Sequence, residues 1–198
     1  MAKKENAQQP KLTRAEEFKV DLFFWLQALV VALAVMILIF TFVGRIITVD
    51  GSSMLPTLHD KDVMILRSIG YHPKQGDIVV LTKDFGHYEN APIVKRVIAV
   101  GGQSVRVDYA ESKVYVDGEA LDEPYTLENY LIEPHSATYS ITEMVVPEGS
   151  VFVLGDNRNN SSDSRHVELG AIDERYIIGK TVLTLPIGSA LTNLLGEN

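Results

Sequence analysis

The sequence predicts a mainly β protein, in which antiparallel sheets form an open barrel or sandwich after a single transmembrane helix. One long apolar run near the N-terminus predicts the helix. Short runs rich in branched apolar residues, separated by turn-forming residues, predict the sheets. No helical period of useful length is visible after residue 60, so the rest of the chain is expected to be almost free of helix.

The apolar run covers residues 22–44 and contains no charged residue. At ~1.5 Å of rise per residue it makes about 35 Å of helix, enough to cross a hydrocarbon core of ~30 Å. A cleaved signal peptide has a shorter apolar stretch of roughly 7–15 residues and a small-x-small exit. A buried helix of a folded domain normally shows a polar face, and this run shows none. The run therefore predicts a retained membrane anchor.

The distribution of basic residues predicts how the anchor is oriented. Residues 1–21 carry five basic residues, whereas Arg45 stands alone just beyond the span. The positive-inside rule then places the tail in the cytoplasm and residues 45–198 outside, in a single-pass protein of the cell membrane. Within that outer domain, the more polar and irregular stretch 108–147 is expected to be a smaller inserted β subdomain.

Eight apolar runs after the anchor predict strands, because they are short and rich in β-branched residues. They cover residues 46–49, 63–66, 78–81, 93–100, 104–107, 113–116, 151–154 and 177–185. Asp117-Gly118 follows one of these runs and is a strong signal for a two-residue hairpin turn.

Composition excludes several kinds of function. The chain has no cysteine, which excludes disulfides, thiolate zinc sites and a cysteine nucleophile. The net charge is −8, and an acidic domain is a poor partner for nucleic acid. No two of the five histidines have the spacing of metal ligands on a helix. We therefore expect no nucleic-acid partner, no metal and no cofactor.

Three polar features interrupt the apolar pattern of the outer domain. Residues 51–58 and residues 155–165 each follow an apolar run and mix hydroxyl side chains with turn formers. Lys95 lies inside a strand that is otherwise mostly apolar. Taken alone, the first two are ordinary polar loops, and a strand lysine usually points outward from a sheet edge or extends toward water.

Taken together, the three features resemble the bacterial type I signal peptidases, the Ser–Lys peptidases of family S26, in the form with one N-terminal anchor. In that family a serine precedes Met-x-Pro-Thr, as at residues 53–57. Gly76-Asp77, then Lys95-Arg96 in a strand that ends at glycine, and finally residues 155–165 match the later boxes in family order. The resemblance covers roughly residues 20–186.

The resemblance implies a serine endopeptidase that cleaves signal peptides from secretory preproteins after a small-x-small motif, beside the lipid bilayer. Ser53 would be the nucleophile and Lys95 its general base, oriented by the Ser161 hydroxyl. The same box would supply a supporting ion pair and further structural partners; these residues are Asp163 with Arg165, and Asp156 with Arg158.

The proposed chemistry is physically coherent. A serine hydroxyl is a weak nucleophile and needs a nearby base. A free lysine is protonated near pH 8, but burial disfavours the ammonium and lowers its pKa by up to several units. The apolar residues on both sides of Lys95 make a dry amine plausible. Arg96 cannot replace it, because a guanidinium does not deprotonate in proteins.

The sequence leaves alternatives open for two parts of the substrate site, the oxyanion hole and the pockets for the substrate side chains. Some family members have a serine two residues before the nucleophile that assists the oxyanion hole, and here that position is Gly51. The hole would then depend on the Ser53 backbone N–H, with Ser52 or a water molecule. Five apolar residues either form the pockets for the small substrate side chains or simply pack in the core: Ile47, Val49, Met54, Ile93 and Val94.

Two alternatives compete with a signal peptidase. One is a Ser–Lys self-cleaving regulator of the repressor-protease kind, which the membrane span and the acidic charge disfavour. The other is a catalytically inactive, membrane-tethered β-domain that binds a partner protein. The intact Ser53, Lys95 and Asp163 argue against an inactive domain.

Overall fold

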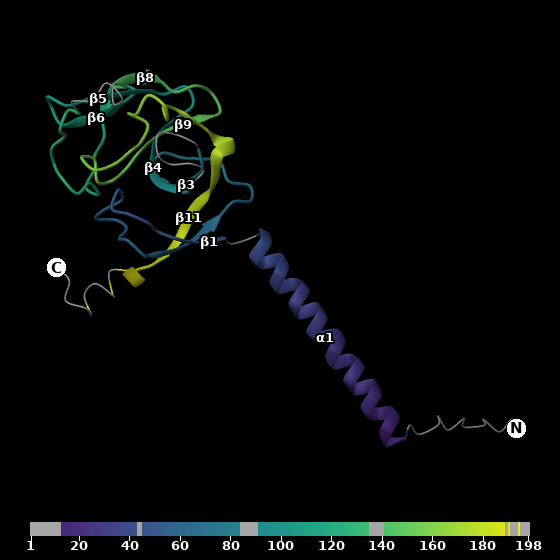
Figure 1. Cartoon of the computed structure of the whole chain (residues 1–198). Coiled ribbons are helices and arrows are strands. Elements are labelled where there is room, and N and C mark those ends of the chain that lie inside the picture. The colour runs from purple at the N-terminus through teal and green to yellow at the C-terminus, as the bar shows by residue number, and fades with distance from the viewer. Residues whose placement is uncertain are drawn as a thin grey trace, which may run out of the picture. The chain divides into compact units, whose positions relative to one another are not determined.

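The computed structural model describes residues 13–42, 45–83, 91–134 and 141–188, together with residues 190 and 194. The chain divides into two compact units, Met1–Thr41 and Phe42–Asn198. The first contains the N-terminal helix and the second contains the strands (Figure 1).

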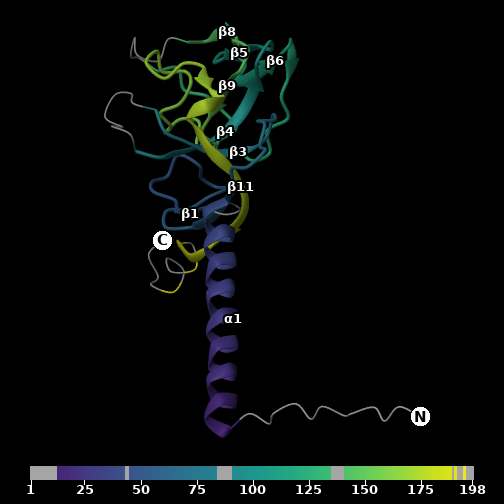
Figure 2. The same ribbon diagram turned by 90° about the vertical axis from the view of Figure 1, so that its right-hand side faces the viewer.

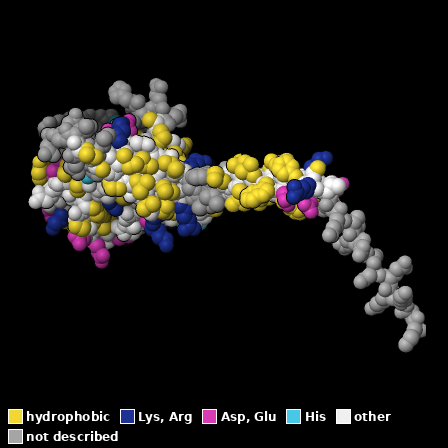
Figure 3. Space-filling model, turned by 90° about the horizontal axis from the view of Figure 1, so that it is seen from below, with side chains coloured by type: hydrophobic (Ala, Val, Ile, Leu, Met, Phe, Trp, Pro, Cys, Tyr) yellow, Lys and Arg dark blue, Asp and Glu magenta, His cyan; other side chains and the backbone are white. Residues whose placement is uncertain are grey.

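Helix α1, Arg14–Phe42, starts at a capping box and contains residues 22–42 of the predicted apolar run; residues 43 and 44 lie outside the described residues. The Glu16 carboxylate accepts hydrogen bonds from the Thr13 backbone N–H at 2.8 Å and from the Thr13 hydroxyl at 2.9 Å. Figure 3 shows hydrophobic side chains around the helix and charged side chains gathered at its N-terminal end. Its stretch Arg14–Leu38 is long and apolar enough to cross a membrane, and none of it is buried by the protein itself. The predicted N-terminal apolar helix is confirmed, although it begins before residue 22.

A seven-stranded antiparallel sheet carries most of the second unit. Its strands run in the order β1-β2-β11-β3-β4-β9-β10. Their bounds are β1 Arg45–Thr48, β2 Val63–Arg67, β11 Ile177–Leu185, β3 Ile78–Leu81, β4 Ile93–Val100, β9 Ser150–Leu154 and β10 Ile172–Asp173. A short 3₁₀ helix, Glu174–Tyr176, joins β10 to β11. Strand β4 is internal, because it pairs with β3 on one side and β9 on the other.

A smaller antiparallel sheet has the strand order β7-β6-β5-β8. Its strands are β5 Ser104–Asp108, β6 Lys113–Val116, β7 Glu119–Ala120 and β8 Glu143–Val145. It lies at the opposite end of the domain from β1 (Figure 1, Figure 2). Asp117 and Gly118 both have positive φ, at 51° and 84°, as the two-residue hairpin turn requires. The sheet starts at Ser104, one strand before the expected subdomain boundary at residue 108.

Three apolar clusters hold the second unit together. One joins the two sheets through Phe152 and Leu154 of β9, which pack with Val105 and Val114 of the smaller sheet. Another lies under the segment that carries Ser53. The mainly β fold is therefore confirmed, and β4 brings Lys95 into its interior.

Candidate active site

The Lys95 amine and the Ser53 hydroxyl are in hydrogen-bond contact. The Nζ–Oγ distance is 2.8 Å, although the two residues come from different segments. Ser53 belongs to the turn that follows β1, and its neighbour Met54 is buried in the apolar cluster beneath. Lys95 faces Val79 of β3 in the middle of the large sheet and is only 3% exposed. This arrangement puts a buried amine beside one particular alcohol.

The surroundings of the amine lower its pKa. Burial is the main cause, and it lowers the pKa of Lys95 from 10.5 to about 8 even though the charges of Asp163 and Asp156 act in the opposite direction. The amine also donates to the Val94 carbonyl oxygen at 2.9 Å. Among the described residues, no ion pair joins Lys95 to a carboxylate. A substantial fraction of the amine is therefore neutral near pH 8.

Asp163 is close enough to influence Lys95, but its carboxylate is engaged by Arg165. The Arg165 Nε and Nη2 atoms lie 2.8 and 2.9 Å from the two Asp163 oxygens. Burial alone would raise the pKa of Asp163, but the charge and hydrogen bonds of Arg165 outweigh burial and hold the pKa below its usual value. The resemblance also predicted this pair, which places a negative and a positive charge near the amine with opposite effects on its pKa.

Ser161 lines the same cleft, but it does not make the contact expected of it. Its Oγ is buried and has no hydrogen-bond partner in the part of the chain that the structure describes. The amine of Lys95 is directed instead to Ser53 and to the Val94 carbonyl. A Cβ on Gly155 would lie 2.3 Å from the Ser161 Oγ and 2.5 Å from the Ser53 carbonyl oxygen, so only glycine fits there.

Two asparagines of the loop after β9 fix the backbone around the nucleophile. The Asn157 backbone N–H donates to the Ser53 carbonyl at 3.0 Å, and its side-chain amide donates to the Ser52 carbonyl at 3.1 Å. Asn160 donates to the Ser52 Oγ at 3.1 Å. Gly51 has φ of +92°, a conformation that strains any other residue. A serine at this position, as in some family members, would need a different backbone.

A cleft of about 480 Å³ surrounds the two reactive atoms. Four of the five apolar residues proposed as pocket residues line it: Val49, Met54, Ile93 and Val94. Ile47 does not line the cleft and packs instead against the apolar cluster below the nucleophile. Ile132 and Pro134 also line the cleft, and neither was predicted from the sequence because both lie in irregular backbone with no motif around them.

The model of the family "Signal peptidase, peptidase S26" matches residues 22–185. The chain belongs to this signal peptidase family. It is a serine peptidase that cleaves signal peptides and is anchored in a membrane, as the sequence resemblance predicted.

Individual members of the signal peptidase family resemble the chain over most of its length. Signal peptidase I of Bacillus licheniformis is 36% identical over 168 residues, covering 81% of this chain and 87% of that protein. A probable signal peptidase I of a Synechocystis strain is 40% identical over 159 residues, covering 76% of each. A signal peptidase I structure from Enterococcus faecalis covers 56% of this chain and 97% of its own, with 28% identity and a TM-score of 0.44.

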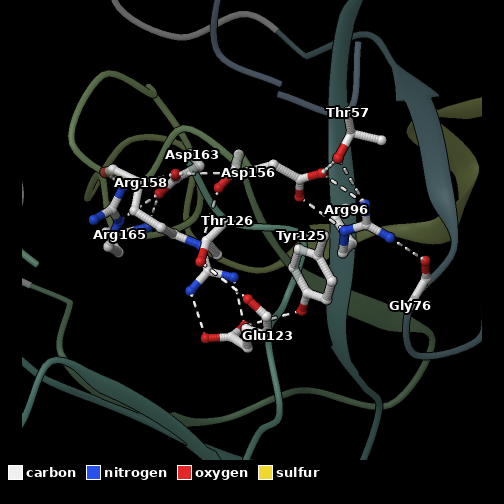
Figure 4. Close-up of polar contacts among 11 residues, drawn as sticks. Thr57, Gly76, Arg96, Glu123, Tyr125, Thr126, Asp156, Arg158, Asp163 and Arg165 are labelled. Carbon is white, nitrogen blue, oxygen red and sulfur yellow. Dashed lines mark hydrogen bonds and ion pairs between the residues drawn. The ribbon is translucent and has the colours of Figure 1, made fainter. Parts of the chain in front are cut away.

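The chain also contains a cluster of largely buried charges around the loop at residues 155–165, which follows β9 and is called the catalytic loop below (Figure 4). Asp156 binds Arg96 through two hydrogen bonds of 2.8 and 2.6 Å and accepts the Thr57 hydroxyl at 2.5 Å. The Arg96 guanidinium lies 3.9 Å from the centre of the Tyr125 ring. Asp156 therefore links β4 to the segment that carries the nucleophile.

Asp156 and Arg158 lie in the same loop, but each pairs with a residue from outside that loop. Arg158 is buried and binds both oxygens of Glu123, at 2.8 and 2.5 Å. Glu123 lies in an irregular stretch after β7 and was missed by the sequence reasoning. Glu123 is 35 positions from Arg158 and has no periodic pattern around it, so the sequence contains no signal that the two residues pair.

Proposed function

We propose that this peptidase cleaves signal peptides with a Ser53–Lys95 dyad, through an acyl-enzyme. The observation that carries the proposal is the 2.8 Å contact between the Ser53 hydroxyl and a lysine amine that is 3% exposed. A general base must be neutral to accept a proton, and burial from water keeps a larger share of the Lys95 amine neutral. Ser–Lys pairs are a known variant of serine catalysis.

The reaction has two acyl-transfer steps. As the Ser53 Oγ attacks the scissile carbonyl, its proton passes to the Lys95 Nζ, and the ammonium then protonates the leaving amine. In the second step Lys95 takes a proton from water, whose oxygen attacks the ester. The resulting ammonium then protonates the departing Ser53 Oγ, which restores the free hydroxyl and the neutral amine. The negative carbonyl oxygen of each intermediate would be stabilised by the Ser53 backbone N–H, with the Ser52 hydroxyl, itself fixed by Asn160.

The residues around Lys95 would hold the dyad in place. Asp163 and Arg165 supply a buried ion pair beside it, while Asp156 and Arg158 tie the catalytic loop to Arg96 and Glu123. Ser161 remains a candidate for orienting the amine, because its unpartnered Oγ lines the cleft.

The apolar lining of the cleft favours a substrate with small side chains. An extended peptide can pair with exposed strand-like backbone, and alternate side chains then enter pockets. Val49, Met54 and Val94 line the cleft and are almost fully buried, and we propose that they leave only shallow pockets for the substrate side chains. Shallow apolar pockets accept alanine and exclude larger groups, which supports cleavage after a small-x-small sequence.

The proposed location follows from the anchor and its flanking charges. Five basic residues precede the apolar run, and Arg45 is the single basic residue just after it. This pattern favours a cytoplasmic N-terminus and an extracytoplasmic catalytic domain in the cell membrane. Protease added outside sealed cells should then degrade the catalytic domain and spare the N-terminal tail; the opposite protection pattern would reverse the orientation.

The dyad is tested by cleavage of a preprotein with an Ala-x-Ala site by the detergent-solubilised full chain. Ser53→Ala, Lys95→Ala and Lys95→Arg should each lower kcat by more than about 10³-fold, because acid–base catalysis alone contributes up to ~10⁴-fold. Lys113→Arg, at an exposed lysine, is the matched control and should keep wild-type activity. Wild-type turnover by Lys95→Arg would remove lysine from the mechanism. Binding without cleavage by the wild type would favour the inactive β-domain.

A further inference from the structure

We propose that Ile132 is a substrate-contacting residue, which selects preproteins with an apolar side chain just before the small-x-small sequence. The proposal rests on the signal-peptide cleavage proposed above. Ile132 lines the same cleft as Ser53 and Lys95, yet it lies outside every segment that resembles the family boxes. Its side chain is 55% exposed, so a bound substrate can cover apolar surface that water now contacts.

The backbone of Ile132 is fixed beside the catalytic loop by Asn159. The Asn159 Oδ1 accepts from the Ile132 backbone N–H at 2.9 Å, and the Nδ2 donates to the Tyr130 carbonyl at 3.1 Å. One amide therefore binds a donor and an acceptor two residues apart, as a neighbouring strand would. Asn159 is next to Asn160, which donates to the Ser52 Oγ, so this contact holds Ile132 beside the segment that carries Ser53.

Two further contacts fasten the segment that leads to Ile132. The buried Arg158 guanidinium binds both carboxylate oxygens of Glu123, and the Leu127 backbone N–H donates to the Asp156 carbonyl at 3.2 Å. Charge-assisted bidentate pairs are the most directional side-chain contacts in proteins. Together with Asn159, they attach residues 123–132 to the catalytic loop at three points. The segment is therefore a built wall of the cleft.

The chemistry of a signal peptide identifies what covers this wall. Its small-x-small exit follows a run of 7–15 apolar residues, whereas the start of the mature protein has no fixed character. The exposed apolar side chain of Ile132 would gain contact only from an apolar neighbour. The substrate part that fits is therefore the signal-peptide side, where the apolar run meets the small residues.

The test compares two peptides that share one Ala-x-Ala site and carry either leucine or serine at the positions just before it. Ile132→Asp should raise KM for the leucine peptide about tenfold, the cost of a lost apolar contact, with kcat within about twofold. The KM of the serine peptide should change little. Ile69→Asp is the matched control, because Ile69 is 53% exposed and does not line the cleft. That control should leave both peptides unchanged.

Two more variants keep the test decisive if Ile132→Asp folds poorly. Ile132→Ala should show the same selective rise in KM at smaller size, and Asn159→Ala should reproduce it by releasing the segment. An equal loss on both peptides, or a selective loss only when residues after the cleavage site are varied, would overturn the assignment. If the wild type cleaves neither peptide, the signal-peptidase function itself fails, and that result is distinct from a loss of selectivity.

Discussion

The chain contains the same short ion pair in two different environments. Asp163-x-Arg165 and Asp173-x-Arg175 share sequence spacing and geometry. In the first, the two Nη/Nε–oxygen distances are 2.8 and 2.9 Å; in the second they are 2.9 and 2.7 Å. In both, the arginine backbone N–H also donates to the aspartate.

The two pairs differ almost entirely in their access to water. The Asp163 and Arg165 side chains are 0% and 3% exposed, whereas those of Asp173 and Arg175 are 34% and 87% exposed. The buried pair is also tied to the Gly155 N–H and the Arg158 carbonyl, and its carboxylate raises the pKa of Lys95. The exposed pair caps the 3₁₀ helix Glu174–Tyr176. Of the two identical motifs, only the one from which water is excluded lies at the candidate active site.

The largest expected difference between the pairs is in stability. Asp163→Ala should lower the free energy of unfolding by about 3–5 kcal/mol, because it leaves the Arg165 guanidinium buried without a counter-charge. Asp173→Ala should cost much less, mainly from the lost N-cap of the 3₁₀ helix, since water replaces the exposed ion pair. Denaturant unfolding of the two variants beside the wild type measures both. Equal losses would show that burial does not separate the pairs.

Lys95 is also buried, but it has no carboxylate paired with it among the described residues. Removing its charge should therefore stabilise the protein, whereas removing the Asp163 charge should destabilise it. A pKa of about 8 for Lys95, against 10.5 when exposed, means that burying the ammonium costs about 3 kcal/mol at neutral pH. Lys95→Met should therefore raise the free energy of unfolding by up to that amount while abolishing cleavage. The gain should be full below pH 8 and should fade as pH rises to about 10.5, where the unfolded lysine also loses its proton. An unchanged or lower stability at pH 7 would contradict a costly buried charge.

The sequence predicted the fold where strands carry their own pattern. The runs at residues 78–81, 93–100 and 113–116 coincide with strands β3, β4 and β6. The strands that were missed, β7, β8 and β10, have two or three residues each and form mainly because neighbouring strands offer hydrogen bonds. Such strands have too few residues to show an alternating pattern.

The site was predictable only where its residues form a recognisable motif. Ser53 and Lys95 were found through the boxes around them, and no periodicity would have paired residues 42 positions apart. Glu123, Ile132 and Pro134 lie in irregular backbone, and their place at the site follows from tertiary packing. The contact between Ser161 and Lys95 was inferred from the resemblance alone. Whether it forms depends on where tertiary packing places the hydroxyl and the amine, and in the structure the Ser161 Oγ has no partner among the described residues.

The subtlest expected difference between the two ion pairs is electrostatic and appears in the pH profile. In the proposed dyad mechanism cleavage requires neutral Lys95, so kcat/KM of the wild type should rise with pH through about 8. The negative charge of Asp163 favours the ammonium and raises that pKa, so Asp163→Asn should move the rise to lower pH. Asp173→Asn removes an equal charge from an exposed site, and solvent screening should leave the profile in place. A lower rate for Asp163→Asn with an unmoved midpoint would mean that this carboxylate supports the site through packing alone, without setting the basicity of the amine.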